Sequence, residues 1–350
     1  MQKKLIALAV AGLVSAPAFA QSNVQIYGVM DLGFRHLSGS EENGIHPGLK
    51  SRSGIDSSGQ STSRLGFRGT EDLGNGLKAF FTIESQLSPD TSSQTTSDRQ
   101  AFLGLEGGFG RVWLGRDFNP SRALISGLDP FGATGIGSGQ QLFQQTTRYD
   151  NAIMYRTPSF GGLTVTLAYT QNISGDEGAQ LKGAADPNSK GWSITPIYKN
   201  GPLTVGFGYE KYSDADVKRW NLGGGYDFGV VDLRLAYGQT KDDANNTKRK
   251  SWMLAGVIPV TERGKILASY VQTKLDQAGS DEKAKQYAIG YSHDLSKRTA
   301  VYATYAKIST NNAAEGEYSL GMGNPGAYNT TVGGAASYTS GFNVGLRHNF

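Results

Sequence analysis

The chain lacks cysteine entirely and has no hydrophobic run long enough to form a transmembrane helix. With 0 Cys among 350 residues, no disulfide can stabilise the fold. Nothing after residue 20 approaches the roughly 20 apolar residues that a membrane-spanning helix requires, so a helical membrane protein is excluded. The mean hydropathy is −0.38 although the chain contains 48 Gly, 17 Tyr and 15 Phe. This composition is not that of a helical or α/β enzyme.

Catalytic and cofactor motifs are also scarce. The four histidines lie in no recognisable arrangement of nucleophile and base: His36, His46, His293 and His348. The glycine-rich segment 117–147 is not followed by Gly-Lys-Ser/Thr, which argues against a phosphate-binding loop. The sequence therefore implies no metal ion and no cofactor. A formal charge of +4 gives no reason to expect nucleic acid as a partner.

The first twenty residues have the pattern of a secretory signal peptide. Lys3-Lys4 precedes an apolar run over 5–14, and Ala18-Phe19-Ala20 supplies a small-x-small cleavage site. We therefore expect residues 1–20 to be removed on export, leaving a mature chain of residues 21–350. Removing the two lysines from the formal charge of +4 leaves +2.

Strict alternation of apolar and polar residues marks the end of the chain. In residues 341–350, Phe342, Val344 and Leu346 share one face of an extended strand, polar side chains take most of the other, and the chain ends on Phe350. Such a strand fits the wall of a closed barrel in lipid, whereas an edge strand of a soluble sandwich is the alternative. The alternation also explains the low mean hydropathy, because only every second residue would face lipid.

About sixteen strands are expected, separated by segments rich in Gly, Asn, Asp and Pro. They begin near Val24, Thr62, Leu77, Arg99, Arg111, Arg148, Leu163, Lys190, Leu203, Val217, Val230, Arg249, Gly264, Ala284, Thr299 and Gly341. Short turns alternate with long connections, as periplasmic turns and extracellular loops do in outer-membrane barrels; the long connections are 38–61, 117–147, 172–189 and 309–340. The expected fold class is all-β, a transmembrane antiparallel 16-stranded β-barrel. At this width side chains cannot fill the interior, so we expect an aqueous channel.

The connection 117–147 has little strand pattern, and a structureless loop of this length usually has a functional use. Its four glycines within 132–139 allow tight backbone turns, so we expect it to fold back into the lumen and narrow the channel. Asp117, Arg122 and Asp129 are its candidate charged residues. For Arg122 and Asp129, the sequence leaves open whether each faces the pore or braces the wall.

Four further segments are typical of a known family. They are SRLGFRGTEDLG from Ser63, GRD from Gly115, YRTPSFGG from Tyr155 and DLSKRT from Asp294. With these motifs the chain resembles the general porins of Gram-negative bacteria, particularly the anion-preferring, trimeric beta-proteobacterial type. The resemblance runs from the signal peptide to the last residue. It implies an outer-membrane homotrimer of 16-stranded barrels, a third loop folded into each pore, and passive diffusion of small hydrophilic solutes, anionic or neutral.

In that family three arginines from neighbouring strands lie across from the constriction loop, and the resemblance assigns these positions to Arg64, Arg99 and Arg148. Alternation supports a lumenal position for Arg64, since the apolar residues on either side of Gly66 take the lipid face. It also supports Arg148, with Tyr149 expected on the opposite face.

Arg99 fits the alternation less simply. It shares its face with Leu103 and Leu105, so either the strand carries a bulge or those leucines face the lower lumen. A bulge inserts one extra residue and so changes which face the following side chains take. The sequence is compatible with both interpretations.

Other charged residues are placed in the lumen by alternation alone. Arg35 shares the lumen face with Asp31, and Lys78 and Glu84 point inward if the apolar residues between them meet lipid. Glu84 is then positioned to compensate part of the arginine charge. A single lumenal arginine can simply brace the wall through a salt bridge, but several at a narrow passage attract anions and exclude cations.

Further partners follow from the outer-membrane location. Phe350 and the alternation before it are expected to act as the assembly signal, because the last strand must be recognised by the insertion machinery and then seal against the first strand. Outer-membrane lipid would surround the barrel. The basic run 248–250 is by default a solvated loop end, and the sharper hypothesis is contact with lipopolysaccharide phosphates.

A passive channel is the leading functional hypothesis. A barrel enzyme, such as an outer-membrane hydrolase, is the second, and it would need a nucleophile with an oriented base. A role of the long loops as adhesin or phage receptor is the third, and it can coexist with conduction.

Overall fold

The computed structural model describes residues 23–39, 51–91, 98–143, 148–173, 190–213, 216–277, 280–311, 320 and 338–350. The expected signal peptide, His46 and most of the connections 172–189 and 309–340 lie outside the described residues. Within the described part, none of the helices has the length and apolar character needed to cross a membrane.

Within the described residues, seventeen β-strands form one sheet. The first eight are β1 (Asn23–Gly39), β2 (Arg52–Ser57), β3 (Arg64–Gly74), β4 (Leu77–Gln86), β5 (Asp98–Gly107), β6 (Gly110–Phe118), β7 (Arg148–Arg156) and β8 (Leu163–Thr170). The remaining nine are β9 (Gly191–Asn200), β10 (Leu203–Tyr212), β11 (Val217–Asp227), β12 (Asp232–Asp242), β13 (Thr247–Pro259), β14 (Gly264–Gln277), β15 (Ser280–Asp294), β16 (Thr299–Thr310) and β17 (Tyr338–Asn349). Two helices are described, α2 (Pro120–Leu128) and α3 (Gln140–Phe143), both in the connection between β6 and β7.

The seventeen segments make a wall of 16 antiparallel strands, because β2 and β3 share one place in it. One part of β1, Leu32–Leu37, pairs with β2, and another part, Asn23–Val29, pairs with β3. The predicted 16-stranded barrel is confirmed. The short strand β2 itself was expected to be part of the connection 38–61.

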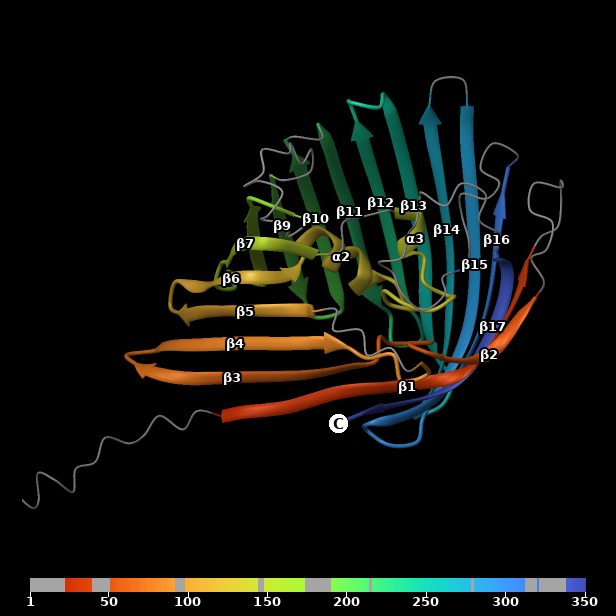
Figure 1. The fold of residues 1–350 in the computed structure, drawn as a ribbon, viewed down its shortest axis with the longest axis horizontal. Coiled ribbons are helices and arrows are strands. Elements are labelled where there is room, and N and C mark those ends of the chain that lie inside the picture. The colour runs from red at the N-terminus through yellow and green to blue at the C-terminus, as the bar shows by residue number, and fades with distance from the viewer. Residues whose placement is uncertain are drawn as a thin grey trace, which may run out of the picture.

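The sheet closes on itself where the first strand meets the last (Figure 1). Strand β1 pairs with β17 from Val29 opposite Asn349 to Gly39 opposite Tyr338. Closure satisfies the strand backbone groups internally, as a membrane requires. The loop helices α2 and α3 lie within the curve of the wall, between the strands β3–β7 and β10–β14 (Figure 1).

The two faces of the wall differ as the alternation predicts. Large apolar side chains on the outer face are exposed, for instance Leu103 at 64%, Leu235 at 57% and Ile289 at 55%. Polar side chains such as Asn221 and Gln286 are buried on the inner face. The apolar exterior suits lipid and the polar interior suits water.

Aromatic residues are paired across neighbouring strands on the outer face. Trp192 lies 5.2 Å from Tyr209, and Trp252 lies 4.9 Å from Tyr270, measured between ring centroids. Rings with one polar edge favour the boundary between lipid and water. These pairs are therefore placed as an interfacial girdle would be.

The seam between β1 and the end of the chain yields a test of the assembly role expected for Phe350. The backbone N–H of Phe350 donates to the carbonyl of Gly28, and the N–H of Gly28 donates to the carbonyl of Phe350, each at 3.1 Å. A Cβ on Gly28 would lie 2.3 Å from the Phe350 ring. Deleting Phe350, or changing Gly28→Leu, should therefore lower the yield of folded protein.

The measurement is the amount of heat-modifiable protein in outer-membrane fractions. Gly54→Ala in β2 is the matched control, because nothing lies within 4 Å of the position its Cβ would take. Normal amounts of folded protein from both seam variants would show that this contact does not govern assembly.

Candidate functional site

The connection between β6 and β7 enters the lumen through a capped helix. The side chain of Asn119 accepts a hydrogen bond from the backbone N–H of Ser121 at 3.0 Å, and Pro120 occupies the first turn of α2. Both residues favour a helix start at this point. The Asn119 amide also donates to Glu210 on β10 at 2.9 Å, which attaches the helix to the wall.

The rest of the described loop is held against the opposite wall by polar side chains of the strands. The Gln286 amide donates to the carbonyls of Ile136, Gly137 and Ser138 at 3.3, 3.1 and 3.0 Å. The Ser251 hydroxyl donates to the carbonyl of Leu142 at 2.6 Å. Apolar loop residues pack beside these bonds on Met253, Val271 and Ile308, among others.

Asp129 closes the loop on itself. Its carboxylate accepts backbone hydrogen bonds from Phe131 at 2.9 Å and from Gly139 at 2.8 Å, and it is 3% exposed. Burial raises the pKa of Asp129 to about 7, although the hydrogen bonds from the backbone oppose the shift. This carboxyl therefore braces the loop and does not face the water of the lumen.

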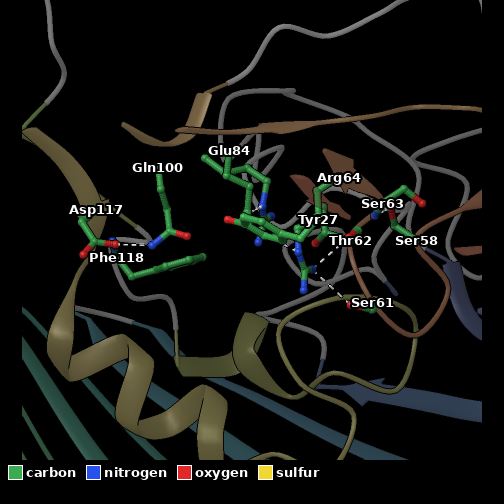
Figure 2. A network of polar contacts seen from close by, with 11 residues as sticks. Tyr27, Ser58, Ser61, Thr62, Ser63, Arg64, Glu84, Gln100, Asp117 and Phe118 are labelled. Atoms are coloured by element: carbon green, nitrogen blue, oxygen red, sulfur yellow. Dashed lines mark hydrogen bonds and ion pairs between the residues drawn. The ribbon is translucent and has the colours of Figure 1, made fainter. Parts of the chain in front are cut away.

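Glu84 is the centre of the charged site on the β1–β5 wall (Figure 2). One carboxylate oxygen accepts from Arg99 Nε at 2.6 Å, and the other lies 3.4 Å from Arg64 Nε and accepts from the Tyr27 hydroxyl at 3.0 Å. Arg64 also donates to the carbonyl of Thr62 at 3.0 Å. Two guanidinium groups thus share one carboxylate, which leaves a net positive charge.

Phe118 joins Arg99 to Arg148. The Arg148 guanidinium lies 4.6 Å from the centre of the Phe118 ring and the Arg99 guanidinium lies 5.6 Å from it. Such stacking holds a guanidinium without neutralising it. Among the described residues, the buried Nε of Arg148 has no hydrogen-bond partner.

Asp117 fixes the position of that ring. Its carboxylate accepts from the Gln100 amide at 2.6 Å, the Trp113 indole at 2.9 Å and the backbone N–H of Phe118 at 2.7 Å. Figure 2 shows Gln100 and Asp117 pointing toward each other above Phe118. Asp117 therefore orients the first residues of the loop.

A bulge in β5 brings Arg99 to the lumen. Glu84 pairs with Gln100 and the next residue of β4, Ser85, pairs with Asp98, so Arg99 is the extra residue. Beyond the bulge Leu103 remains on the outer face, 64% exposed. Of the two interpretations left open by the sequence, the structure contains the bulge.

A second irregularity, in β7, shifts the residues around Arg148. Between Gly115 and Asp117 of β6 the register shifts, and Asn151 on the partner strand has a φ of 48°. The expectation that Tyr149 faces outward is wrong: Tyr149 is fully buried, with its hydroxyl 3.1 Å from that of Tyr212. Asparagine tolerates this left-handed conformation, and the extra residue in β7 turns Tyr149 to the face opposite to the one that alternation predicts.

Not every predicted residue joins the cluster. Arg35 is 2% exposed and lies 3.2 Å from Asp56 of β2, six positions along β1 from the residue opposite Arg64, or about 20 Å at the rise of a strand. Lys78 is exposed at the start of β4, equally far along its strand from Glu84. Arg122 is buried on α2, where its positive charge still acts on Arg148.

Sequence reasoning missed three residues of the lumen: Tyr27, Phe118 and Gln286. No motif points to Tyr27 or Phe118, which are two of 17 tyrosines and 15 phenylalanines. Gln286 does carry a signal, because it interrupts the small inward-facing residues Ala284 and Ala288 of β15. An isolated amide in such a row is a signal for a partner in the lumen.

The site combines charged side chains of the wall with a loop that lies inside the lumen. Among the described residues, no group of three or more His, Asp or Glu side chains gathers as a metal site. A closed barrel with an apolar exterior, a polar interior and 16 strands is a transmembrane barrel of the size that encloses an aqueous channel.

Comparisons with known proteins agree with this class. Residues 7–314 match the family described as Gram-negative porin. Outer membrane porin protein 32 of Delftia acidovorans is 37% identical over 370 residues, covering 100% of each chain. An outer membrane porin protein of Bordetella pertussis is 31% identical over 365 residues, covering 88% of this chain and 94% of that protein.

Solved structures show the same fold. The anion-selective porin from Comamonas acidovorans matches with a TM-score of 0.77 and 32% identity, covering 94% of this chain and 100% of that one. A trimer form of OmpT of Vibrio cholerae matches with a TM-score of 0.68 and 17% identity, covering 94% and 99%. The chain belongs to the Gram-negative porin family, and its barrel is an outer-membrane porin.

The shared carboxylate generates a prediction about charge. Glu84→Gln removes the one negative charge that Arg64 and Arg99 share, so the local positive charge should rise and anion preference should increase. The measurement is the zero-current potential of purified channels in a potassium chloride gradient. Glu262→Gln, an exposed carboxylate in the turn between β13 and β14, is the control for loss of a negative charge elsewhere. A lower anion preference in Glu84→Gln would contradict this view of the cluster.

Proposed function

We propose that the porin conducts small hydrophilic solutes passively with a preference for anions, and that the connection 117–147 sets the narrowest cross-section. The observation that carries the proposal is the uncompensated charge of the cluster. Arg64, Arg99 and Arg148 bear three positive charges, and Glu84 supplies one negative charge to the first two.

Guanidinium groups suit this role because they stay charged at every physiological pH. Near low-dielectric walls their field acts over a distance comparable to the Debye length, about 8 Å in physiological salt. A passage of similar width would concentrate anions and repel cations, whereas a wider vestibule would be screened. The likeness to an anion-selective porin supports the same preference.

Other parts of the proposal concern assembly and export. We propose a homotrimer, which the trimer form of a porin of the same fold supports. We also propose that residues 1–20 are an export signal, that β17 with Phe350 is recognised by the insertion machinery, and that lipid and lipopolysaccharide surround the barrel. We propose no enzymatic activity for this protein. Turnover of ester or peptide substrates by the purified protein would contradict this.

Neutralising the cluster tests the selectivity. The triple variant Arg64→Gln, Arg99→Gln, Arg148→Gln should shift the zero-current potential toward cations, because only Glu84 would remain charged among these four residues. The anion preference of the unchanged protein should weaken in high salt. Arg263→Gln, exposed in the turn between β13 and β14, is the control for the loss of one positive charge outside the cluster. An unchanged potential in the triple variant would refute the selectivity proposal.

Deleting 128–139 tests the loop. The deletion removes Asp129 and the three carbonyls that Gln286 holds, so conductance should rise and bulkier solutes should pass. Gln286→Ala should have a smaller effect in the same direction, because it removes the hydrogen bonds and keeps the loop. Conductance and size cut-off equal to those of the unchanged protein would mean that the loop does not limit the pore.

A further inference from the structure

A second charged feature of the lumen lies apart from Glu84. A cavity of about 280 Å³ lies between the first turn of α2 and the wall formed by β4–β8. Its lining combines the rings of Phe80, Phe102 and Trp113 with the guanidinium groups of Arg111 and Arg156. Arg111 stands near the start of β6 and Arg156 ends β7, so the cavity lies toward the short-turn end of the barrel.

The two arginines of this cavity form a like-charged pair. Arg111 and Arg156 are directly opposite each other on β6 and β7. Like charges in this position destabilise a sheet, since facing side chains are only about 5 Å apart at Cβ. The pair thus keeps two cations together although like charges at this position repel each other.

Compensation of this charge is incomplete. Arg111 Nε lies 2.8 Å from a Glu106 carboxylate oxygen, while Arg156 Nε donates to the Thr166 hydroxyl at 3.1 Å. Among the described residues, no carboxylate forms an ion pair with Arg156, although the negative charge of Asp117 acts on it. Asp117 also lines the cavity, but its carboxylate already accepts the three hydrogen bonds that position Phe118.

The aromatic rings hold both guanidinium groups by stacking. The Arg111 guanidinium lies 4.0 Å from the centre of the Phe80 ring, and that of Arg156 lies 5.8 Å from the centre of the Trp113 ring. Stacking uses the flat face of a guanidinium and leaves its N–H edge available for a carboxylate, which it binds in a planar, bidentate manner.

We propose that this cavity binds small aromatic carboxylates such as benzoate, with the carboxylate on Arg156 and Arg111 and the ring against the apolar lining. The volume is just below the range of drug-sized ligand pockets, so it suits a single ring. Phe102, Pro120 and Ala123 provide an apolar surface that a strongly hydrated inorganic anion does not use. Such a site adds a solute class to the proposed channel function, and it rests on that function, because the lumen must admit these solutes.

The test is single-channel recording of the intact porin in constant potassium chloride. Benzoate should reduce the open-channel current in a concentration-dependent, saturable manner. Acetate carries the same carboxylate without a ring, and benzylamine carries the ring with the opposite charge. At equal ionic strength, neither should reduce the current at the concentrations where benzoate does.

Variants of Arg156 connect the effect to the cavity. Arg156→Gln should raise the half-blocking benzoate concentration about tenfold or more, because a charge-assisted hydrogen bond is lost. Arg156→Lys should give an intermediate value, since the charge stays but the planar fork is gone. Arg263→Gln is the control on an exposed turn and should behave as the unchanged protein does.

The outcomes separate this site from the selectivity proposal. Equal effects of benzoate and acetate, or an unchanged half-blocking concentration in Arg156→Gln, would overturn the binding site. The zero-current potential without benzoate, measured on the same channels, reports the anion preference independently. If Arg156→Gln does not fold, the test is quenching of tryptophan fluorescence by benzoate in the unchanged protein and in Arg156→Lys. We expect weaker quenching in the variant. Equal quenching would contradict the binding site.

Discussion

Closure of the sheet between β1 and β17 is the constraint on which the rest of the structure depends. In lipid every strand N–H and C=O must find a partner within the wall, so an open edge is not tolerated. The paired bonds between Gly28 and Phe350 continue that closure to the last residue. A closed wall of this width leaves an interior that side chains cannot fill, and the loop with α2 and α3 occupies part of it.

The positive charges of the lumenal arginines are compensated to different degrees. Arg64 and Arg99 share Glu84, Arg148 stacks on Phe118, and the Arg111–Arg156 pair lies nearer the short turns. A guanidinium held by an aromatic ring has no negative charge beside it, whereas the field of one paired with a carboxylate is largely offset by its partner. The wall thereby presents positive charge at two levels of the channel.

The sequence predicted the barrel well and the site only partly, for a physical reason. Lipid on one side and water on the other enforce period-two alternation, which any strand of the wall must show. Bulges interrupt that period: the one at Arg99 was one of two open interpretations, and the one near Asn151 turned Tyr149 inward against expectation. The isolated amide of Gln286 signals a partner in the lumen, but no local pattern identifies the loop carbonyls that it binds, because they lie about 150 positions away.

The anion preference proposed for the arginine cluster can be measured directly as the zero-current potential of the unmodified porin across a potassium chloride gradient, at low and high ionic strength. We expect a potential with the sign of preferred chloride permeation, and a smaller one when the Debye length falls from about 10 Å at 0.1 M to about 3 Å at 1 M salt. A potential with the sign of potassium permeation, or one that does not depend on ionic strength, would show that the cluster does not select anions by charge.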